Sequence, residues 1–179
     1  DKNEFFYGKE PNDYLYEKSL ALSPKSKILS IGEGEGRNAV YLAKQGHHVT
    51  CVDESKVGLE KAVSFASQNK VEIETLVADL NHYQFETNSF DAIISIWCHL
   101  PSELRNKVHR DCVKALRPGG FIILEAYTPR QLENNSGGPK NIDMLMTKEA
   151  LLFEFEGMRI IEMIEKDRMV NEGVGHIGM

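Results

Sequence analysis

Three features are missing from this sequence of 179 residues, and each absence excludes a class of protein. No apolar run approaches the roughly 20 residues that span a bilayer, and the chain does not open with a signal-peptide pattern. The three cysteines, Cys51, Cys98 and Cys112, show neither the paired spacing of a disulfide framework nor a metal-binding motif. We therefore expect a cytoplasmic protein without membrane contact, in which Cys51 and Cys98 are buried as small apolar residues.

Positive charge is also scarce. The chain carries 21 Lys and Arg residues against 27 Asp and Glu residues, a net charge of −6, whereas a general nucleic-acid binder usually carries a basic face. The hydrophobic fraction of 41% and the charged fraction of 27% are those of an ordinary globular protein. The length suits one domain over residues 1–179, with residues 1–25 forming an N-terminal helix and lid, and we expect a monomer or homodimer without a nucleic-acid partner.

Apolar segments typical of strands alternate along the chain with segments typical of helices. This alternation indicates an α/β fold, a parallel sheet covered by helices on both faces. The expected strands lie at 27–31, 48–52, 71–77, 90–97, 120–127 and 158–166, and the expected helices at 11–22, 36–45, 56–68, 101–116 and 147–154. Ser55 is the expected N-cap of the third helix, and the polar loop 128–141 is long enough to predict a place near the active site.

The most informative stretch is the glycine-rich turn Gly32-Glu33-Gly34-Glu35-Gly36, which joins the first strand to its helix. Glycine has no Cβ, so a ligand can approach the backbone of such a turn closely. Asp53 ends the next apolar segment, where a carboxylate can accept both hydroxyl groups of a ribose. Together these features predict a βαβ unit that binds a nucleoside.

The glycine spacing helps to distinguish a dinucleotide from a nucleoside ligand that lacks a pyrophosphate. In a dinucleotide fingerprint, Gly-x-Gly-x-x-Gly, counting from Gly32 would place the third glycine at Arg37. Counting from Gly34 reaches Ala39, a permitted replacement, but the first glycine then follows the strand too late. The spacing favours a ligand without a pyrophosphate, and a nicotinamide-dependent oxidoreductase stays open as the alternative.

Three later features fall at matching intervals: Asp79 after the third strand, the apolar strand at 90–97, and Pro118-Gly119-Gly120 before the strand at 120–127. With these features, nearly the whole chain resembles the class I S-adenosylmethionine (SAM) methyltransferases. Within that group, the segments 7–12, 36–43 and 125–129 resemble the tellurite-resistance and thiopurine-methyltransferase-like branch.

This resemblance implies a Rossmann-like fold with a mostly parallel sheet of seven strands and helices on both faces. The strand at 158–166 would open the closing antiparallel pair, and residues 173–179 would hold the turn and the first step of its last, incomplete strand. The superfamily usually has an acidic residue where this chain has Ser30, and Glu33 would then supply the carboxylate.

The cofactor implied by the resemblance is S-adenosyl-L-methionine, and no metal is expected. The residues expected to bind it are Gly32, Gly34 and Gly36 under the methionine part, Glu33 at the ammonium group, Asp53 with its neighbour Glu54 at the ribose, Asp79 and Leu80 at the adenine, and Ile96 at the same edge of the sheet. Each assignment has a structural alternative: the glycines would serve only the turn, Asp53 would cap a helix, and Asp79 would be an ordinary loop residue.

The residues expected to meet the methyl acceptor are His99, Tyr127 and Arg37. His99 would remove a proton from a thiol or hydroxyl group, or would hold its loop through a backbone carbonyl. Arg37 would steer an anionic acceptor, or would be a solvated surface charge. Trp97 would be a pocket wall or core, and Lys166, Asp167 and Arg168 read as exposed charges.

The function that the resemblance implies is methyl transfer from SAM to a small molecule, such as a thiol or a chalcogen oxyanion. Because the sulfonium leaving group is already activated, such an enzyme mainly positions donor and acceptor and excludes water. A non-catalytic SAM-binding protein stays open as a further alternative.

Overall fold

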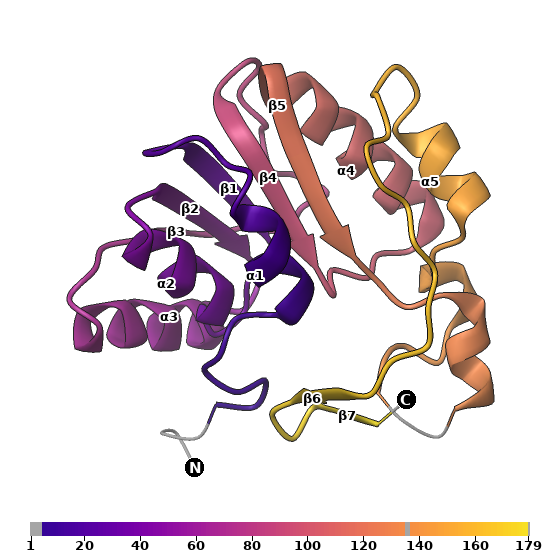
Figure 1. Cartoon of the computed structure of the whole chain (residues 1–179), viewed down its shortest axis with the longest axis horizontal. Helices are drawn as coiled ribbons and strands as arrows, with labels where there is room; N and C mark the ends of the chain where they lie inside the picture. Colours follow the sequence, from indigo (N-terminus) through magenta and orange to yellow (C-terminus); the bar gives the residue numbers. More distant parts are fainter. Residues whose placement is uncertain (1–4, 135–136, 179) are drawn as a thin grey trace.

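A five-stranded parallel sheet forms the centre of the computed structural model, which describes residues 5–134 and 137–178 (Figure 1). The strand order is β3-β2-β1-β4-β5. The chain adds β2 and β3 on one side of β1 and then β4 and β5 on its other side, so the direction of winding reverses between β1 and β4. These strands are β1 (Lys27–Ile31), β2 (His48–Asp53), β3 (Glu74–Val77), β4 (Phe90–Ile96) and β5 (Leu116–Glu125). Ligands in open α/β sheets bind at such a reversal, outside the carboxyl ends of the strands.

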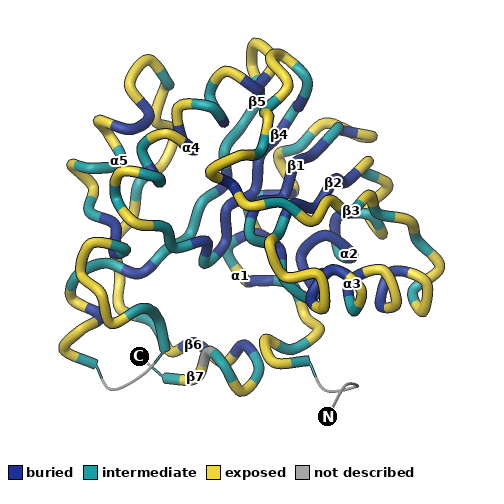
Figure 2. Tube along the Cα trace, turned by 180° about the vertical axis from the view of Figure 1, so that it is seen from behind, coloured by how far each residue is buried: buried dark blue, intermediate teal, exposed yellow. Residues whose placement is uncertain are grey.

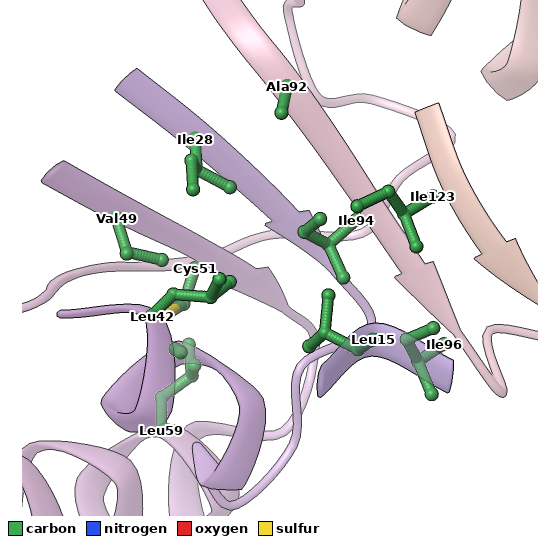
Figure 3. Close-up of a cluster of buried hydrophobic side chains, with 11 residues drawn as sticks. Leu15, Ile28, Leu42, Val49, Cys51, Leu59, Ala92, Ile94, Ile96 and Ile123 are labelled. Carbon is green, nitrogen blue, oxygen red and sulfur yellow. The ribbon is translucent and has the colours of Figure 1, made fainter. Parts of the chain in front are cut away.

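Helices cover both faces of this sheet. They are α1 (Asp13–Ser19), α2 (Arg37–Lys44), α3 (Lys56–Gln68), α4 (Ser102–Ala115) and α5 (Lys148–Glu154), with short 3-10 helices at Pro129–Glu133 and Ile142–Met144. One buried cluster joins the sheet to α1, α2 and α3, and its side chains converge in Figure 3. A second cluster joins the opposite face to α4. Ile28 and Leu29 are neighbours on β1 but belong to different clusters, because successive side chains of a strand point to opposite faces.

The central strands are the most continuously buried part of the chain, as Figure 2 shows for β1, β2 and β4. Their apolar runs predict this burial, since a parallel sheet is covered on both faces. The expected helix at 56–68 coincides with α3, and the Ser55 side chain accepts the Gly58 N–H at 3.1 Å, which confirms the predicted N-cap. The helix expected at 11–22 is shorter, because Asn12 caps α1 and the helix ends at Ser19.

The sheet has five strands, so the expectation of seven is wrong. The segment 158–166 is not a strand, and Ile161 and Ile164 in it are 67% and 63% exposed. An antiparallel pair does follow it, but β6 (Val170–Glu172) and β7 (His176–Gly178) form a separate two-stranded sheet, called the ribbon below. A strand exists only where a neighbour pairs with its backbone, and the apolar composition of 158–166 does not specify that neighbour.

A buried ion cluster attaches α5 to α4. The Glu154 carboxylate accepts from Arg105 Nε at 2.9 Å and lies 2.7 Å from His109 Nδ1. All three side chains are no more than 4% exposed.

Among residues 5–134 and 137–178, no helix has the length and apolarity needed to cross a bilayer.

Candidate active site

The glycine turn lies at the carboxyl end of β1 and has three residues in left-handed backbone conformations. The φ angles are 63° at Gly32, 61° at Gly34 and 88° at Gly36, a region that side-chain-bearing residues avoid. A Cβ on Gly36 would lie 2.5 Å from the Ala62 Cβ, and one on Gly32 would lie 2.8 Å from the Cys98 sulfur. A Cβ on Gly34 would meet nothing within 4 Å. Two of the glycines therefore permit close packing, while Gly34 leaves open space beside the turn.

The Glu33 side chain lies beside Ser30, the position at which the resemblance calls for an acidic residue. Its carboxylate is buried and accepts from the Ser30 hydroxyl and, at 2.8 Å, from the Ala39 N–H in the first turn of α2. Burial raises the pKa of Glu33, and these hydrogen bonds partly offset that rise. Because the carboxylate already satisfies this helix end, its contacts favour a structural role over binding of a ligand's ammonium group.

Asp53 ends β2 next to the glycine turn. Its carboxylate accepts the Gly34 N–H at 2.9 Å and the Ser55 N–H at 2.8 Å. Asp53 therefore links the second strand to the one glycine of the turn that faces open space. The neighbouring Glu54 is exposed.

Asp79 and Leu80, the residues expected at the adenine, follow β3, and Ile96, expected at the same edge, ends β4. Asp79 is exposed in the loop after β3, and its pKa is lowered chiefly by the hydrogen bond from the Asn81 N–H. Leu80 and Ile96 are both buried in the two core clusters, at 8% and 6% exposure.

Trp97 follows β4 in a left-handed conformation that is uncommon for a bulky residue, with φ at 58°. Its indole stacks on the Tyr127 ring with centroids 4.4 Å apart, and the His99 ring lies 5.5 Å from Tyr127 on a nearly parallel plane. Burial, followed by the charges of Glu172 and Glu125, raises the pKa of Tyr127 to about 12. Its phenol is therefore neutral at pH 7.

Both ring nitrogens of His99 contact the backbone. Nδ1 lies 3.0 Å from the Trp97 carbonyl oxygen, and Nε2 accepts the Tyr127 N–H at 2.9 Å. The ring is then the neutral tautomer with its proton on Nδ1. These contacts favour the loop-holding alternative for His99, while a catalytic role stays a prediction.

Arg37, the first residue of α2, is buried, so the surface-charge alternative for it is wrong. Its guanidinium pairs with Glu172 of β6, 135 residues away in the sequence. The same carboxylate accepts from Trp97 Nε1 at 2.7 Å and from Asn12 Nδ2 at 2.8 Å. The ribbon thus places a carboxylate among donors from three separate parts of the fold.

Arg168 is not the exposed charge that the sequence suggests. Its side chain is 19% exposed and donates to the Glu125 carboxylate at 2.9 and 3.0 Å. Its guanidinium lies 5.8 Å from the centre of the Trp97 ring and 3.3 Å from a Glu172 oxygen. Burial lowers the pKa of Arg168, but the two carboxylates outweigh this effect and raise it.

The segment expected to form a lid contacts both the glycine turn and the ribbon. The Phe6 N–H donates to Glu35 at 2.7 Å, and the Phe6 carbonyl accepts the Gly175 N–H at 3.0 Å. Phe5 packs on Phe65 of α3, with ring centroids 5.1 Å apart. Residues 1–4 of the expected lid lie outside the described residues.

The loop 128–141 passes beside Tyr127. A Cβ on Gly138 would lie 2.6 Å from the Tyr127 ring, so this part of the loop touches the aromatic stack. Residues 135–136 of the loop lie outside the described residues.

Within the part of the chain that the structure describes, no group of three or more His, Cys, Asp or Glu residues could hold a metal ion.

Four contacting residues escape the sequence reasoning: Asn12, Glu125, Arg168 and Glu172. Glu125 carries a usable signal, since it is an acidic residue at the carboxyl end of β5, a parallel strand beside β4. Glu172 carries none, because the short ribbon that positions it has no strong local pattern.

Comparison with protein families gives one match, over residues 28–120, to a family described as a methyltransferase domain. A curated relative, the uncharacterized methyltransferase YodH of Bacillus subtilis, is 30% identical over 120 residues, which are 65% of this chain and 51% of that protein. The chain spans about half, or less, of the length of the curated relatives it matches.

Solved structures share the fold, among them the following two. The PH0226 protein of Pyrococcus horikoshii OT3 has a TM-score of 0.66 and 21% identity, and the match covers 78% of this chain and 76% of that chain. Phosphoethanolamine N-methyltransferase 1 of Haemonchus contortus, solved with phosphoethanolamine and S-adenosylhomocysteine, has a TM-score of 0.60 and 20% identity, with 75% of this chain and 28% of that chain covered.

Proposed function

This chain belongs to the methyltransferase domain family, a family of SAM-dependent enzymes, and we propose that it transfers a methyl group from SAM to a small-molecule acceptor. The observation that carries the proposal most directly is the contact between Asp53 and Gly34 at the carboxyl edge of the sheet. A carboxylate and an open glycine meet there, which suits a ribose lying beside a backbone that a ligand can approach closely.

The residues present fit a nucleoside cofactor. Gly34 leaves open space beside the turn, and Asp53 offers carboxylate oxygens next to that space. In this proposal Asp79 binds the adenine amino group, and Leu80 and Ile96 form the apolar support beneath the cofactor. When bound, SAM supplies a methyl group on a positively charged sulfur that leaves without further activation. The chain then needs only to bind, orient the acceptor and exclude water.

The acceptor is proposed to lie beside the aromatic stack of Trp97, His99 and Tyr127. Tyr127 has a pKa raised to about 12, so at neutral pH it donates a hydrogen bond instead of acting as a base. Its position next to the loop 128–141 suits a wall of the acceptor site. His99 holds the two strand ends together through Trp97 and Tyr127.

The assignment to the tellurite-resistance branch is a finer proposal than the family match supports. Relatives in this family carry names of enzymes for unlike acceptors, including phosphoethanolamine and sarcosine. A thiol acceptor is compatible with the uncharged Tyr127 ring beside the proposed acceptor position. An inorganic oxyanion suits this position less well, because the carboxylates of Glu125 and Glu172 lie on the acceptor side.

The test is the affinity for SAM, measured by calorimetry on the whole chain, with NADH as the rival ligand. We expect SAM to bind and NADH not to bind. Replacing Asp53 by Ala should weaken SAM binding by more than about 1 kcal/mol, or roughly fivefold, because the charge-assisted hydrogen bonds to the ribose are lost.

The matched control is Asp111→Ala, which removes a carboxylate of α4 that pairs with Lys114 on the same helix. It should leave the affinity for SAM unchanged. If Asp53→Ala binds SAM as tightly as the parent chain, the ribose assignment is wrong, and if NADH binds in place of SAM, the oxidoreductase alternative is correct.

A further inference from the structure

The ribbon and the residues just before it place two opposite charges on the acceptor side of the site. Glu172 of β6 and Arg168, two residues before β6, lie beside each other, with Arg168 Nη2 3.3 Å from a Glu172 oxygen. Each also contacts a group of opposite charge in the body of the protein. The two charges differ in their main counter-charge, which is Arg37 for Glu172 and Glu125 for Arg168. Their sites share Trp97 and Asn12.

The Glu172 carboxylate, the negative charge of this pair, lies in a site formed by several donors. Glu172 is 8% exposed, and its carboxylate accepts from the Arg37 guanidinium, from Trp97 Nε1 at 2.7 Å and from Asn12 Nδ2 at 2.8 Å. Asn12 caps α1, Arg37 begins α2, and Trp97 follows β4, so three separate elements converge on this carboxylate. Convergent donors of this kind form a specific carboxylate site.

The Arg168 guanidinium, the positive charge of this pair, lies in a second site formed by Glu125 and Trp97. The Glu125 carboxylate, at the end of β5, accepts from Arg168 at 2.9 and 3.0 Å, and the Trp97 ring lies 5.8 Å from the guanidinium carbon. A carboxylate beside an aromatic face is a favourable setting for an organic cation. Trp97 serves both charges, because its ring face lies near the cation and its N–H binds the anion.

The ribbon has little apolar surface to keep it in place. Its strands are three residues long, and Met169, Val174 and Ile177 are 67%, 63% and 57% exposed, whereas Val170 is buried. An isolated two-stranded hairpin is marginally stable by itself.

The turn of the ribbon packs on residues 6–8, where the Phe6 carbonyl accepts the Gly175 N–H at 3.0 Å. On the side of the candidate site, the polar contacts of Glu172 and of the neighbouring Arg168 attach it, and such contacts can be exchanged for similar ones.

We propose that Arg168 and Glu172 stand in for the two charges of the acceptor, and that the acceptor is a small zwitterion with a carboxylate and an ammonium group, of the amino-acid class. Its carboxylate replaces that of Glu172 at Arg37, Trp97 and Asn12, and its ammonium group replaces Arg168 at Glu125, as the ribbon moves aside. The inference rests on the proposed function, because these groups lie at the same sheet edge as the glycine turn.

Charge balance favours a zwitterion over a simple ion. Displacing the ribbon leaves the buried Arg37 cation and the Glu125 anion, and a zwitterion pairs with both. A lone anion such as tellurite would leave Glu125 unpaired, and a lone amine would leave Arg37 unpaired. An uncompensated buried charge is strongly unfavourable, so both simple ions should bind weakly.

The experiment uses the fluorescence of Trp97, the single tryptophan of the chain. The protein, saturated with S-adenosylhomocysteine, is titrated with each of the twenty common amino acids, with the matched amines and carboxylic acids that lack one of the two charges, and with sodium tellurite. We expect at least one amino acid to shift the emission and to increase quenching by acrylamide. The matched single-charge analogues should bind at least tenfold more weakly.

Either of two titration results would overturn the inference: no amino acid changes the emission, or a single-charge analogue binds as tightly as its amino acid. Glu172→Gln gives an independent measurement, because it removes the charge of the stand-in carboxylate. It should tighten amino-acid binding at least threefold and increase acrylamide quenching of Trp97, whereas the exposed control Glu156→Gln should change neither. Weaker amino-acid binding by a folded Glu172→Gln variant would show that Glu172 binds the acceptor itself, contrary to the inference.

Calorimetry with S-adenosylhomocysteine separates this inference from the proposed function. If the cofactor product does not bind, the proposed function fails. If it binds normally and the amino acids have no effect, only the zwitterion inference fails.

Discussion

The two sides of the candidate site are built in different ways. The cofactor side is local, because the glycine turn and Asp53 lie within one βαβ unit and contact each other across 19 residues. The acceptor side combines Arg37, Trp97 and Glu125 with Glu172, whose contacts span up to 160 residues. The comparison teaches that local backbone geometry specifies the first side, while the docking of a distant ribbon specifies the second.

The largest expected effect concerns the backbone of the cofactor side. Gly36→Ala should destabilise the protein by about 3 kcal/mol, because it combines a left-handed φ with a Cβ only 2.5 Å from the Ala62 Cβ. Thermal unfolding should show a midpoint lowered by roughly 10 °C for a chain of this length.

Gly34→Ala is the matched variant, because Gly34 has a similar φ but no neighbour within 4 Å of the added Cβ. It should cost only about 1 kcal/mol of stability while still weakening SAM binding. Equal losses of stability for the two variants would show that the contact with Ala62 has no energetic importance.

The next effect compares two buried ion pairs. Arg105→Met should destabilise the protein by about 3 kcal/mol, because Glu154 is left buried between two packed helices. Arg37→Met should cost only about 1 kcal/mol, since the ribbon can turn Glu172 toward water. Urea unfolding of both variants measures the difference, and equal costs would mean that the ribbon is held as rigidly as α5.

A smaller effect concerns pH. Burial raises the pKa of Glu154, but its hydrogen bonds and the charges of His109 and Arg105 outweigh this and hold the pKa below the ordinary value of 4.5. The folded protein therefore binds this proton less readily than the unfolded chain. Glu154 thus contributes stability that is fully present above about pH 4.5 and is lost as the pH falls through the lower, folded value.

Urea unfolding at pH 7 and at successively lower pH checks this sign. The parent chain should lose stability toward low pH more steeply than Glu154→Gln, in which this titration is absent. Glu156→Gln, an exposed residue just after α5, should follow the parent chain. Parallel curves for Glu154→Gln and the parent chain would contradict the shifted pKa.

The smallest expected effect concerns His99. Because both ring nitrogens contact the backbone, His99→Asn should lower the rate of methyl transfer by less than about tenfold, whereas loss of a general base costs about a hundredfold or more. Turnover is measured against pH with the acceptor found by the fluorescence titration. A hundredfold loss, with removal of the acidic limb of the profile that a general base produces, would restore the catalytic interpretation of His99.

Much of the fold is predictable because its signals are local. The expected helix at 56–68 and its Ser55 cap match α3, and the apolar run at 27–31 matches β1. The segment 158–166 is also mostly apolar, yet it does not join the sheet, because strand pairing depends on a partner elsewhere in the chain.

Side-chain environments at the site were less predictable than the backbone around them. The sequence suggests a surface charge for Arg168 and leaves a surface charge open as one of two roles for Arg37, but Arg37 is buried and Arg168 is only 19% exposed. Their burial depends on Glu125 and Glu172, which lie far from Arg37 in the sequence. The local sequence around a charged residue does not show whether an oppositely charged side chain will lie next to it in the folded protein.

The sequence by itself determined the glycine turn, the position of Asp53 and the alternation that builds the parallel sheet. Each of these follows from steric limits on φ or from the spacing of apolar residues over a few positions. Only the tertiary structure decided that Glu172 would meet Arg37 and that the Trp97 indole would lie between two charges. Contacts across 75 to 135 residues depend on how the packed elements dock, and no local pattern carries that information.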